Sequence, residues 1–525
     1  MAKFSARDAR SLGPLIWVFV FITLPWLNPF SPGPTPAVMP WLVSLGSFAM
    51  VLLWGARVPL AQVAACSWLV AALLSAAFGL LQYFGATALF GPWIDSTAVG
   101  EAFANLRQRN QFATLTNIGL AALLWWRVQG QAATMGEGAL ASAKPLAWRA
   151  LAALAAAVLL ALGNAASSSR TGLVQLVLLT AMVGWWQRGR LGWAQSAQLR
   201  LLLAALMAYA IAAFALPTLV GHDLASSGIL ARLHDGGPQC ASRPTLWRNV
   251  LYLIGQKPWF GWGWGELDFA HFITLYPDSR FCEILDNAHN LPLHLAVELG
   301  LPVALLVCGG GLWLTLRAQP WRESDATRQL AWAVVAVILL HSLLEYPLWY
   351  GPFQMAFGLS LWLLWRRPDR LPAGVVAGAQ GLAVGLIVIV TYVAWDYERV
   401  GQIYLTPSMR SRAYREDTLA KIGNSWLFQN QVDFAELTTT DLTSANASHV
   451  NRMAKAMLHF SPEPRVIEKL IESAWLMGHA DEASFYQRRY RAAFAESYAH
   501  WSQAANLPAS ADSAEPRLVT PQVAR

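Results

Sequence analysis

Four short polar segments contain the side chains that could do chemistry. They are residues 105–111 (NLRQRNQ), 167–172 (SSSRTG), 242–247 (SRPTLW) and 286–290 (DNAHN). Arginine binds phosphate through paired hydrogen bonds, amides can position hydroxyl groups, and His289 can act as a base near neutral pH. This set of groups suits an anionic lipid head group and a hydroxyl acceptor, and a lipid pyrophosphate is the obvious candidate.

Several common catalytic motifs are absent from the sequence. We find no P-loop, no HExxH, no GxSxG and no cluster of Asp with the spacing of metal ligands. Their absence argues against ATP hydrolysis, a metalloprotease and a metal-dependent nucleotide-sugar enzyme. We therefore expect chemistry without a metal ion or another cofactor.

The composition indicates a membrane protein. Of 525 residues, 55% are hydrophobic and only 13% are charged, whereas a soluble domain has about 25% charged residues. The 26 Trp and 38 Gly fit membrane helices and their interfacial belts. These values exclude a soluble cytosolic enzyme, a disordered chain and a disulfide-rich secreted scaffold. The net charge of +7 reflects basic residues that anchor helix ends, so we expect no nucleic-acid partner.

Eleven apolar segments are candidates for membrane-spanning helices. They are residues 15–29, 37–55, 60–84, 111–126, 149–165, 171–187, 200–217, 290–316, 329–348, 352–365 and 374–396. Lys and Arg are concentrated in alternate connections, which predicts an N-terminus inside and, with an odd number of spans, a C-terminal tail outside. All four polar segments then lie on the outer side, where arginines run against the usual charge bias and need a reason.

Two parts of the chain are predicted outside the membrane. Residues 218–289 are too long for a simple connection, and their KPWFGWGWGELDF stretch predicts short helices and turns on the membrane surface. Cys240 and Cys282 lie in this loop, where they form either a disulfide, in an oxidising compartment, or two free thiols. Cys66 and Cys308 lie within spans.

The tail begins at residue 398, where charged residues become frequent and long apolar runs end. Around Gly478 it contains two predicted amphipathic helices with the spacing of a helical hairpin. We expect a membrane domain over 1–397, a helical tail domain over 398–510 and a disordered end over 511–525.

Four motifs resemble the O-antigen ligase and polymerase superfamily. AHNLPLHLAVELGLP is similar to its signature of His, an amide or hydroxyl residue, nine residues and Gly-x-x-Gly, with Val303 in place of the second glycine. SSSRTG and the stretch from Ser242 to Gly265 resemble the superfamily's two arginine-bearing segments. NLRQRNQFATL and EYPLWYGPF, with the hydrophilic helical tail, resemble PglL-type protein O-oligosaccharyltransferases. The motifs cover roughly residues 90–365.

The resemblance implies an all-α polytopic protein of the GT-C-like class in the inner membrane, with a long periplasmic loop and a periplasmic site. A glycan would pass from its undecaprenyl-pyrophosphate carrier to Ser or Thr of a periplasmic protein such as pilin, without a metal, while membrane lipid surrounds the helices. The implied base is His289. The implied substrate-binding residues are Arg170 and Arg243 for the pyrophosphate, Gln108 for orientation, and Tyr346 and Tyr350 for closing the pocket.

Alternatives remain at the level of residues and of function. Arg248 competes with Arg243, while Arg107, Asn110 and Gln111 compete with Gln108; the two tyrosines could belong to the interfacial belt. The pair His294 and Glu298 is as readily a structural hydrogen bond, and His341 is best read as a core histidine. Related enzymes ligate O-antigen to the lipid A core or polymerise it. A lipid-linked glycan transporter is the alternative from another class, although the sequence lacks the internal symmetry typical of transporters.

Overall fold

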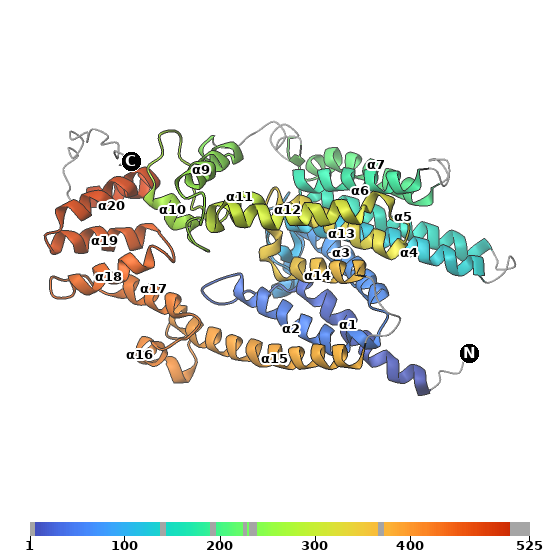
Figure 1. Cartoon of the computed structure of the whole chain (residues 1–525), viewed down its shortest axis with the longest axis horizontal. Helices are drawn as coiled ribbons and strands as arrows, with labels where there is room; N and C mark the ends of the chain where they lie inside the picture. The colour runs from blue at the N-terminus through green and yellow to red at the C-terminus, as the bar shows by residue number, and fades with distance from the viewer. Residues whose placement is uncertain are drawn as a thin grey trace.

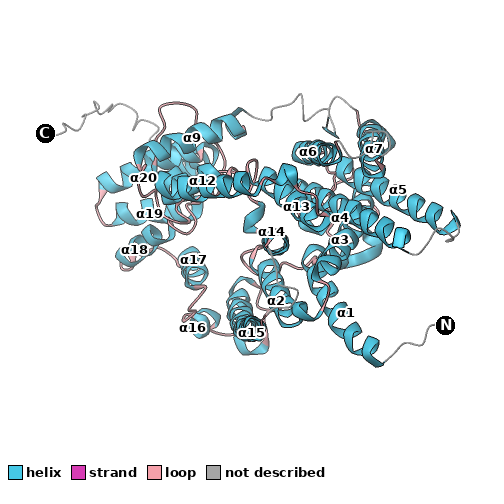
Figure 2. Ribbon diagram, turned by 45° about the vertical axis from the view of Figure 1, so that its right-hand side comes forward, coloured by secondary structure: helices cyan, strands magenta, loops and turns pink. Residues whose placement is uncertain are grey.

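The computed structural model describes residues 6–136, 143–188, 196–223, 228–229, 239–365 and 372–504. The predicted disordered end, 511–525, lies outside the described residues. Within them all regular secondary structure is helical (Figures 1 and 2). The main apolar helices are α1 (Ala6–Leu27), α2 (Val38–Trp54), α3 (Leu60–Tyr83), α4 (Arg109–Gly136), α5 (Ala143–Ala166), α6 (Arg170–Gln187), α7 (Ala197–Leu219), α11 (Leu291–Leu299), α12 (Leu301–Ala318), α13 (Ala326–Ser342), α14 (Gly351–Leu364) and α15 (Ala373–Gly401).

Every predicted apolar segment falls on a helix of this bundle. Among the described residues, six helical stretches are long and apolar enough to cross a membrane, and three more are apolar but shorter. These helices are consistent with a polytopic membrane protein. The total of eleven spans stays a prediction. The two segments that meet neither standard, 111–126 and 171–187, lie in α4 and α6.

The polarity of α4 and α6 has a structural reason. The α4 residues from Gln111 to Trp125 are all buried, so other helices rather than lipid surround them. Inside the bundle the Thr114 hydroxyl lies 2.9 Å from Nδ1 of His341, and the Gln175 amide donates to the Val337 carbonyl at 2.8 Å. These hydrogen bonds join α4, α6 and α13, and they are costly to break in a low-dielectric interior. They hold the helix ends that carry the site, and His341 is a buried core histidine as predicted.

Two of the predicted segments differ from the helices that the structure shows. The segment 290–316 is broken at Gly300, which has φ +86° and separates α11 from α12. A Cβ at Gly300 would collide with the Trp259 carbonyl, so the close packing of the 257–265 loop fixes the break. The segment 329–348 is also too long, because α13 ends at Ser342. Pro347 disfavours a helical continuation, which leaves Glu345 in a loop outside the helix.

The long loop and the tail gather at one end of the molecule (Figure 1). The loop contains α9 (Arg243–Gln256) and α10 (Leu267–Ile273). The tail contains α16 (Thr418–Ile422), α17 (Gln429–Thr439), α18 (Ala447–Met457), α19 (Pro464–Leu476), α20 (Ala480–Ala493) and α21 (Ala495–Ala504). The predicted helix pair about Gly478 is therefore present as α19 and α20, with Gly478 at φ +78° between them.

The tail helices contact the long loop and also the connection between α1 and α2. Phe272 of α10 belongs to the tail's hydrophobic core, and the Arg489 side chain donates to the Ile273 carbonyl at 2.7 Å. The Gln431 side chain of α17 donates to the Thr35 hydroxyl at 3.3 Å, next to the Tyr397 hydroxyl of α15, which donates to the Thr35 carbonyl at 2.8 Å. The tail is thus attached at two separate places and forms one body with the loop.

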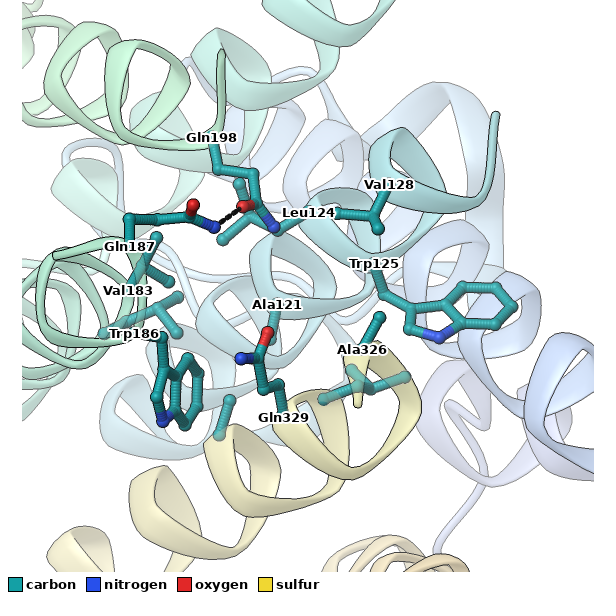
Figure 3. Close-up of a pocket in the computed structure, with 13 residues that line it drawn as sticks. Ala121, Leu124, Trp125, Val128, Val183, Trp186, Gln187, Gln198, Ala326 and Gln329 are labelled. Carbon is teal, nitrogen blue, oxygen red and sulfur yellow. Dashed lines mark hydrogen bonds between the residues drawn. The ribbon is translucent and has the colours of Figure 1, made fainter. Parts of the chain in front are cut away.

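The bundle end away from the loop and tail carries a small pocket that three glutamines and otherwise apolar side chains line. Gln187, Gln198 and Gln329 converge there beside Trp125 and Trp186, and Gln187 donates to Gln198 (Figure 3). Its volume of about 20 Å³ is enough for roughly one water molecule. We assign it the modest role of satisfying amides where α4, α6, α7 and α13 meet.

Candidate active site

His289 is held at a junction whose backbone is fixed from both sides. Its φ of +49° is uncommon for a residue with a Cβ. The Asn287 side chain accepts from the His289 backbone N–H at 2.9 Å. Asn290 caps α11 by accepting from Leu293 N–H at 3.1 Å, and its amide donates to the Leu343 carbonyl at 2.9 Å. The imidazole is therefore presented at the start of α11, beside the end of α13.

Glu345 is the partner of His289. Nδ1 of His289 lies 2.5 Å from a carboxylate oxygen of Glu345, and Arg243 pairs with the other oxygen. Burial raises the pKa of the Glu345 carboxyl, but the hydrogen bond and charge of His289, together with the charge of Arg243, outweigh burial and hold that pKa below its ordinary value. Glu345 is therefore a carboxylate at neutral pH, and it accepts the Nδ1 proton and leaves Nε2 as the basic nitrogen.

Residues from all four polar segments meet around Glu345. The Asn110 side-chain amide donates to the Glu345 carboxylate at 3.3 Å, and the Ser169 hydroxyl donates to the side-chain oxygen Oδ1 of Asn110 at 2.6 Å. Together with Arg243 and His289, these contacts join the N-terminal ends of α4 and α6, the long loop and the start of α11. The predicted segments, far apart in sequence, form one polar cluster.

The remaining predicted residues lie around this cluster in different ways. Arg170 is exposed and directly follows Ser169, the N-cap of α6. Tyr346 approaches the His289 ring edge-on with 5.0 Å between centroids, and Tyr350 stacks on Tyr346 at 5.8 Å. Gln108 instead accepts from the Gln111 backbone N–H at 2.9 Å, as a cap at the start of α4.

Two of the competing residues are placed by the same geometry. Asn110 donates a hydrogen bond to Glu345, and Gln111 forms one with Tyr350. Both residues therefore contact members of the cluster, whereas the side chain of Gln108 caps α4. Arg248 is exposed on α9, whereas Arg243 pairs with Glu345. The structure therefore favours Arg243 over Arg248 at this site.

A pair of tryptophans extends the wall beyond the tyrosines. Trp264 stacks on Trp349 with centroids 6.0 Å apart, and His294 meets Trp349 edge-on at 4.8 Å. His294 and Glu298 are buried, and Nε2 of His294 lies 3.3 Å from a carboxylate oxygen of Glu298. This contact is the structural alternative that the sequence left open for the pair. The Gly-rich loop that carries Trp264 bonds directly to α11, where Trp262 N–H donates to the Val297 carbonyl at 2.8 Å.

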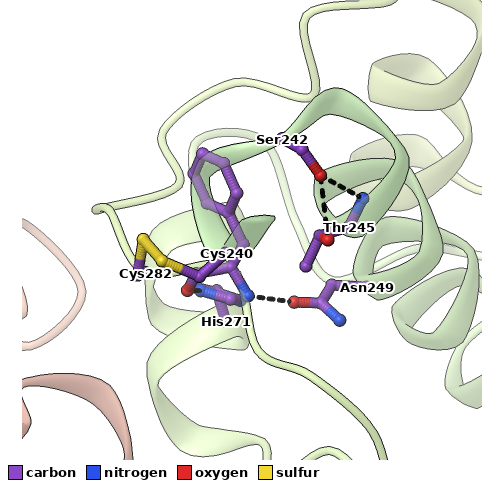
Figure 4. Close-up of a disulfide and its surroundings, with 7 residues drawn as sticks. Cys240, Ser242, Thr245, Asn249, His271 and Cys282 are labelled. Carbon is purple, nitrogen blue, oxygen red and sulfur yellow. Dashed lines mark hydrogen bonds between the residues drawn. A yellow bond between two sulfur atoms is a disulfide. The ribbon is translucent and has the colours of Figure 1, made fainter. Parts of the chain in front are cut away.

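Cys240 and Cys282 form a disulfide next to the start of α9 (Figure 4). Cys240 lies three residues before Arg243, and the bridge joins this approach to α9 to the irregular segment that leads from α10 to His289. Ser242 caps α9 by accepting from Thr245 N–H, and the Trp247 indole donates to the Ala288 carbonyl at 3.1 Å. Arg243 and His289 are thus positioned by one cross-linked loop.

Removing the disulfide should destabilise this loop. The bridged residues are 42 apart in sequence, and closing a loop of that size contributes about 4 kcal/mol. A Cys240→Ser/Cys282→Ser double variant should therefore unfold at a lower temperature than the wild type, which thermal melting would measure. Cys66→Ser is the control outside the loop. Equal melting of the double variant and the wild type would contradict the prediction.

Asp268 gives α10 a pH-dependent stability. Burial raises the pKa of this carboxyl to about 7, and Glu266 and Asp286 add to the effect. The folded protein therefore retains a proton that the unfolded chain releases from pH 3.8 upward, so stability falls as pH rises toward 7 and stays lower above it. Asp268→Asn should raise the melting temperature by about 1–2 °C at pH 8 and hardly at pH 4. The exposed Asp278→Asn is the control; a gain that is equal at both pH values would refute this assignment.

Three known families match successive parts of the chain. Residues 155–308 match the O-antigen ligase family, residues 329–507 match the virulence factor membrane-bound polymerase C-terminal family, and residues 102–126 match the protein glycosylation ligase family. The first match contains Arg170, Arg243 and His289, and the second begins within α13 and contains Glu345. The matches therefore cover both sides of the polar cluster.

Two curated proteins of Acinetobacter baylyi are similar to parts of this chain. A general O-oligosaccharyltransferase is 25% identical over 179 residues, which is 32% of this chain and 30% of the relative. A ComP-specific O-oligosaccharyltransferase is 25% identical over 267 residues, which is 50% of this chain and 44% of the relative. The chain thus matches less than half the length of each relative. Together with the family matches, these similarities support a PglL-type member of the O-antigen ligase superfamily over the parts of the chain that they cover.

Proposed function

We propose that this chain is a protein O-oligosaccharyltransferase of the bacterial inner membrane. It would transfer a glycan en bloc from undecaprenyl pyrophosphate to Ser or Thr of exported proteins such as pilin, at the periplasmic face. The observation that carries the proposal is the His289–Glu345 contact of 2.5 Å with Arg243 on the same carboxylate. The names of the two relatives support the same class of reaction.

His289 supplies the base in this scheme. Because Glu345 accepts the Nδ1 proton, Nε2 can take the proton from the acceptor hydroxyl. The hydroxyl oxygen then bonds to the anomeric carbon while the bond from that carbon to the phosphate oxygen breaks. Attack from the face opposite the leaving group inverts the anomeric configuration, and undecaprenyl pyrophosphate departs. The proton remains on His289 until it is lost to solvent.

The arginines stabilise the leaving group. A guanidinium has five N–H donors, so Arg243 can hold Glu345 and still offer donors to a phosphate. Arg170, exposed at the start of α6, would add a second cation, and the positive end of that helix also favours an anion. Preorganised charge of this kind stabilises the transition state without a metal ion. Tyr346 and Tyr350 would close the pocket, and Gln108 keeps its proposed orienting role together with Asn110 and Gln111.

The tail is a suitable place for the acceptor protein to dock. His459 of the tail stacks on Phe269 of α10 with centroids 3.9 Å apart and lies 2.7 Å from a Glu266 carboxylate oxygen. The tail therefore lies against the same loop that presents Arg243 and His289. We propose that it receives the acceptor and brings its hydroxyl toward His289.

The deciding experiment offers purified full-length protein an undecaprenyl-pyrophosphate oligosaccharide and either a pilin-like protein or lipid A core, with and without EDTA. Glycosylated protein, formed equally in EDTA, is the expected result. Product on lipid A core alone would make the protein an O-antigen ligase, and lengthening of the lipid-linked glycan would make it a polymerase. Translocation of the lipid-linked glycan without transfer would favour a transporter.

A further inference from the structure

A large cavity lies far from the His289 cluster. Its volume is about 1290 Å³, and its walls come from the C-terminal half of α2, the starts of α3, α5 and α15, the later part of α4 and the end of α14. Trp125, which lines it, follows Asn110 by 15 residues along α4, a rise of about 22 Å. The cavity therefore lies near the end of the bundle opposite the proposed active site, where the sequence predicts the inner face.

The walls of this cavity are mostly apolar with a few polar groups. Side chains such as Leu52, Trp126 and Trp362 supply apolar surface, while Arg149, Gln62 and Gln129 supply a cation and two amides. Arg149 lies 6.0 Å from the Trp148 ring centroid, and it has no ion pair among the described residues. A cationic side chain beside a large apolar cavity matches a ligand with an anionic head and long hydrocarbon chains.

We propose that this cavity binds one anionic phospholipid. Its acyl chains would fill the space between α15, α14 and α4, and its phosphate would lie against Arg149 with hydrogen bonds from Gln62 and Gln129. An apolar transmembrane helix would leave the Arg149 charge without a partner. The polyprenyl carrier would hold its own pyrophosphate at the opposite end of the bundle, so it has no anion to place beside Arg149. Basic pockets between helices on the inner side of membranes bind lipid head groups in this way.

Glycines provide variants that test the cavity without disturbing the fold. Gly378 of α15 lines the cavity, and a Cβ placed there would meet no atom within 4 Å. The Cβ of Gly378→Leu therefore meets no atom, and its side chain should fill part of the lipid-binding space. Gly385 is equally open but does not line the cavity, so Gly385→Leu is its matched control. Arg57, exposed and outside the cavity wall, gives the matched control Arg57→Gln for Arg149→Gln.

The experiment measures binding of phosphatidylglycerol and phosphatidylcholine to the full-length protein by native mass spectrometry in mild detergent. The wild type should retain one phosphatidylglycerol in preference to phosphatidylcholine. Arg149→Gln should weaken phosphatidylglycerol binding by about fivefold and erase the preference, and Gly378→Leu should weaken both lipids. The two control variants should bind as the wild type does.

Two results would overturn the lipid proposal. One is equal phosphatidylglycerol retention by all four variants, which is the behaviour of lipid bound only around the outside of the bundle. The other is displacement of phospholipid by added polyprenyl phosphate in the wild type and in His289→Ala alike, which would assign the cavity to the carrier's tail. The experiment measures lipid binding, so its outcome does not depend on whether the protein transfers a glycan.

Discussion

His289→Ala should lower the rate of glycan transfer by about 10³-fold, the usual contribution of a general base. The loss follows from removing Nε2, the nitrogen that Glu345 leaves free to accept the hydroxyl proton. The measurement is the initial rate of acceptor glycosylation by purified protein at saturating donor. Binding of the lipid-linked donor should be nearly unchanged, because the arginines are intact.

A matched control separates this effect from general damage to the protein. His449 is an exposed tail histidine that lies 3.6 Å from a Glu436 carboxylate oxygen, and His449→Ala should keep the wild-type rate. Full activity of His289→Ala would remove this residue from the mechanism. A lost rate accompanied by a lost fold, judged by thermal melting, would instead assign His289 a structural role.

Glu345→Gln should lower the transfer rate by about 10²-fold or more. The amide occupies the same space but carries no charge, so it cannot stabilise the protonated imidazole that forms as His289 takes a proton. The acid limb of the pH–rate profile should move to lower pH for the same reason. Because the pKa of Glu345 is lowered in the wild type, its carboxylate stays charged down to below pH 4.5, and the two proteins should differ over the whole neutral range.

Glu101→Gln is the matched control for this variant. Glu101 also pairs with an arginine, Arg109, but it does not contact His289. Its substitution should change neither the rate nor the pH profile. A Glu345→Gln enzyme with an unchanged profile and a normal rate would show that the carboxylate only fastens the loop, and that His289 needs no partner.

Much of this architecture could be predicted from the sequence because lipid imposes simple rules. A helix in hydrocarbon must satisfy its own backbone and stay apolar where it faces lipid, so all eleven apolar segments fall on helices. α4 shows the limit of this reasoning, because its residues from Gln111 to Trp125 are all buried, and polar groups such as Thr114 and Asn117 lie among its apolar side chains. The break at Gly300 could not be located either, because it depends on the Trp259 backbone packing against it.

The candidate site was only partly predictable for a similar reason. The four polar segments are visible in sequence because arginines and amides are unusual at the outer ends of apolar helices. Glu345 was missed, although it is an acidic residue at the end of an apolar segment and the first residue of EYPLWYGPF. Its importance comes from contacts with Arg243, His289 and Asn110, which lie up to 235 positions away. Spacing along one chain does not reveal such convergence.

If the tail receives the acceptor as proposed, its double attachment limits how acceptor preference can be exchanged between related enzymes. Phe272 of α10 is part of the tail's core, and the Gln431 side chain of α17 donates to the Thr35 hydroxyl. A hybrid that replaced only the tail would give α10 a foreign partner and expose apolar surface one loop away from His289. The unit to exchange is therefore the tail together with residues 266–273 and the connection between α1 and α2. These are three separate stretches of the sequence.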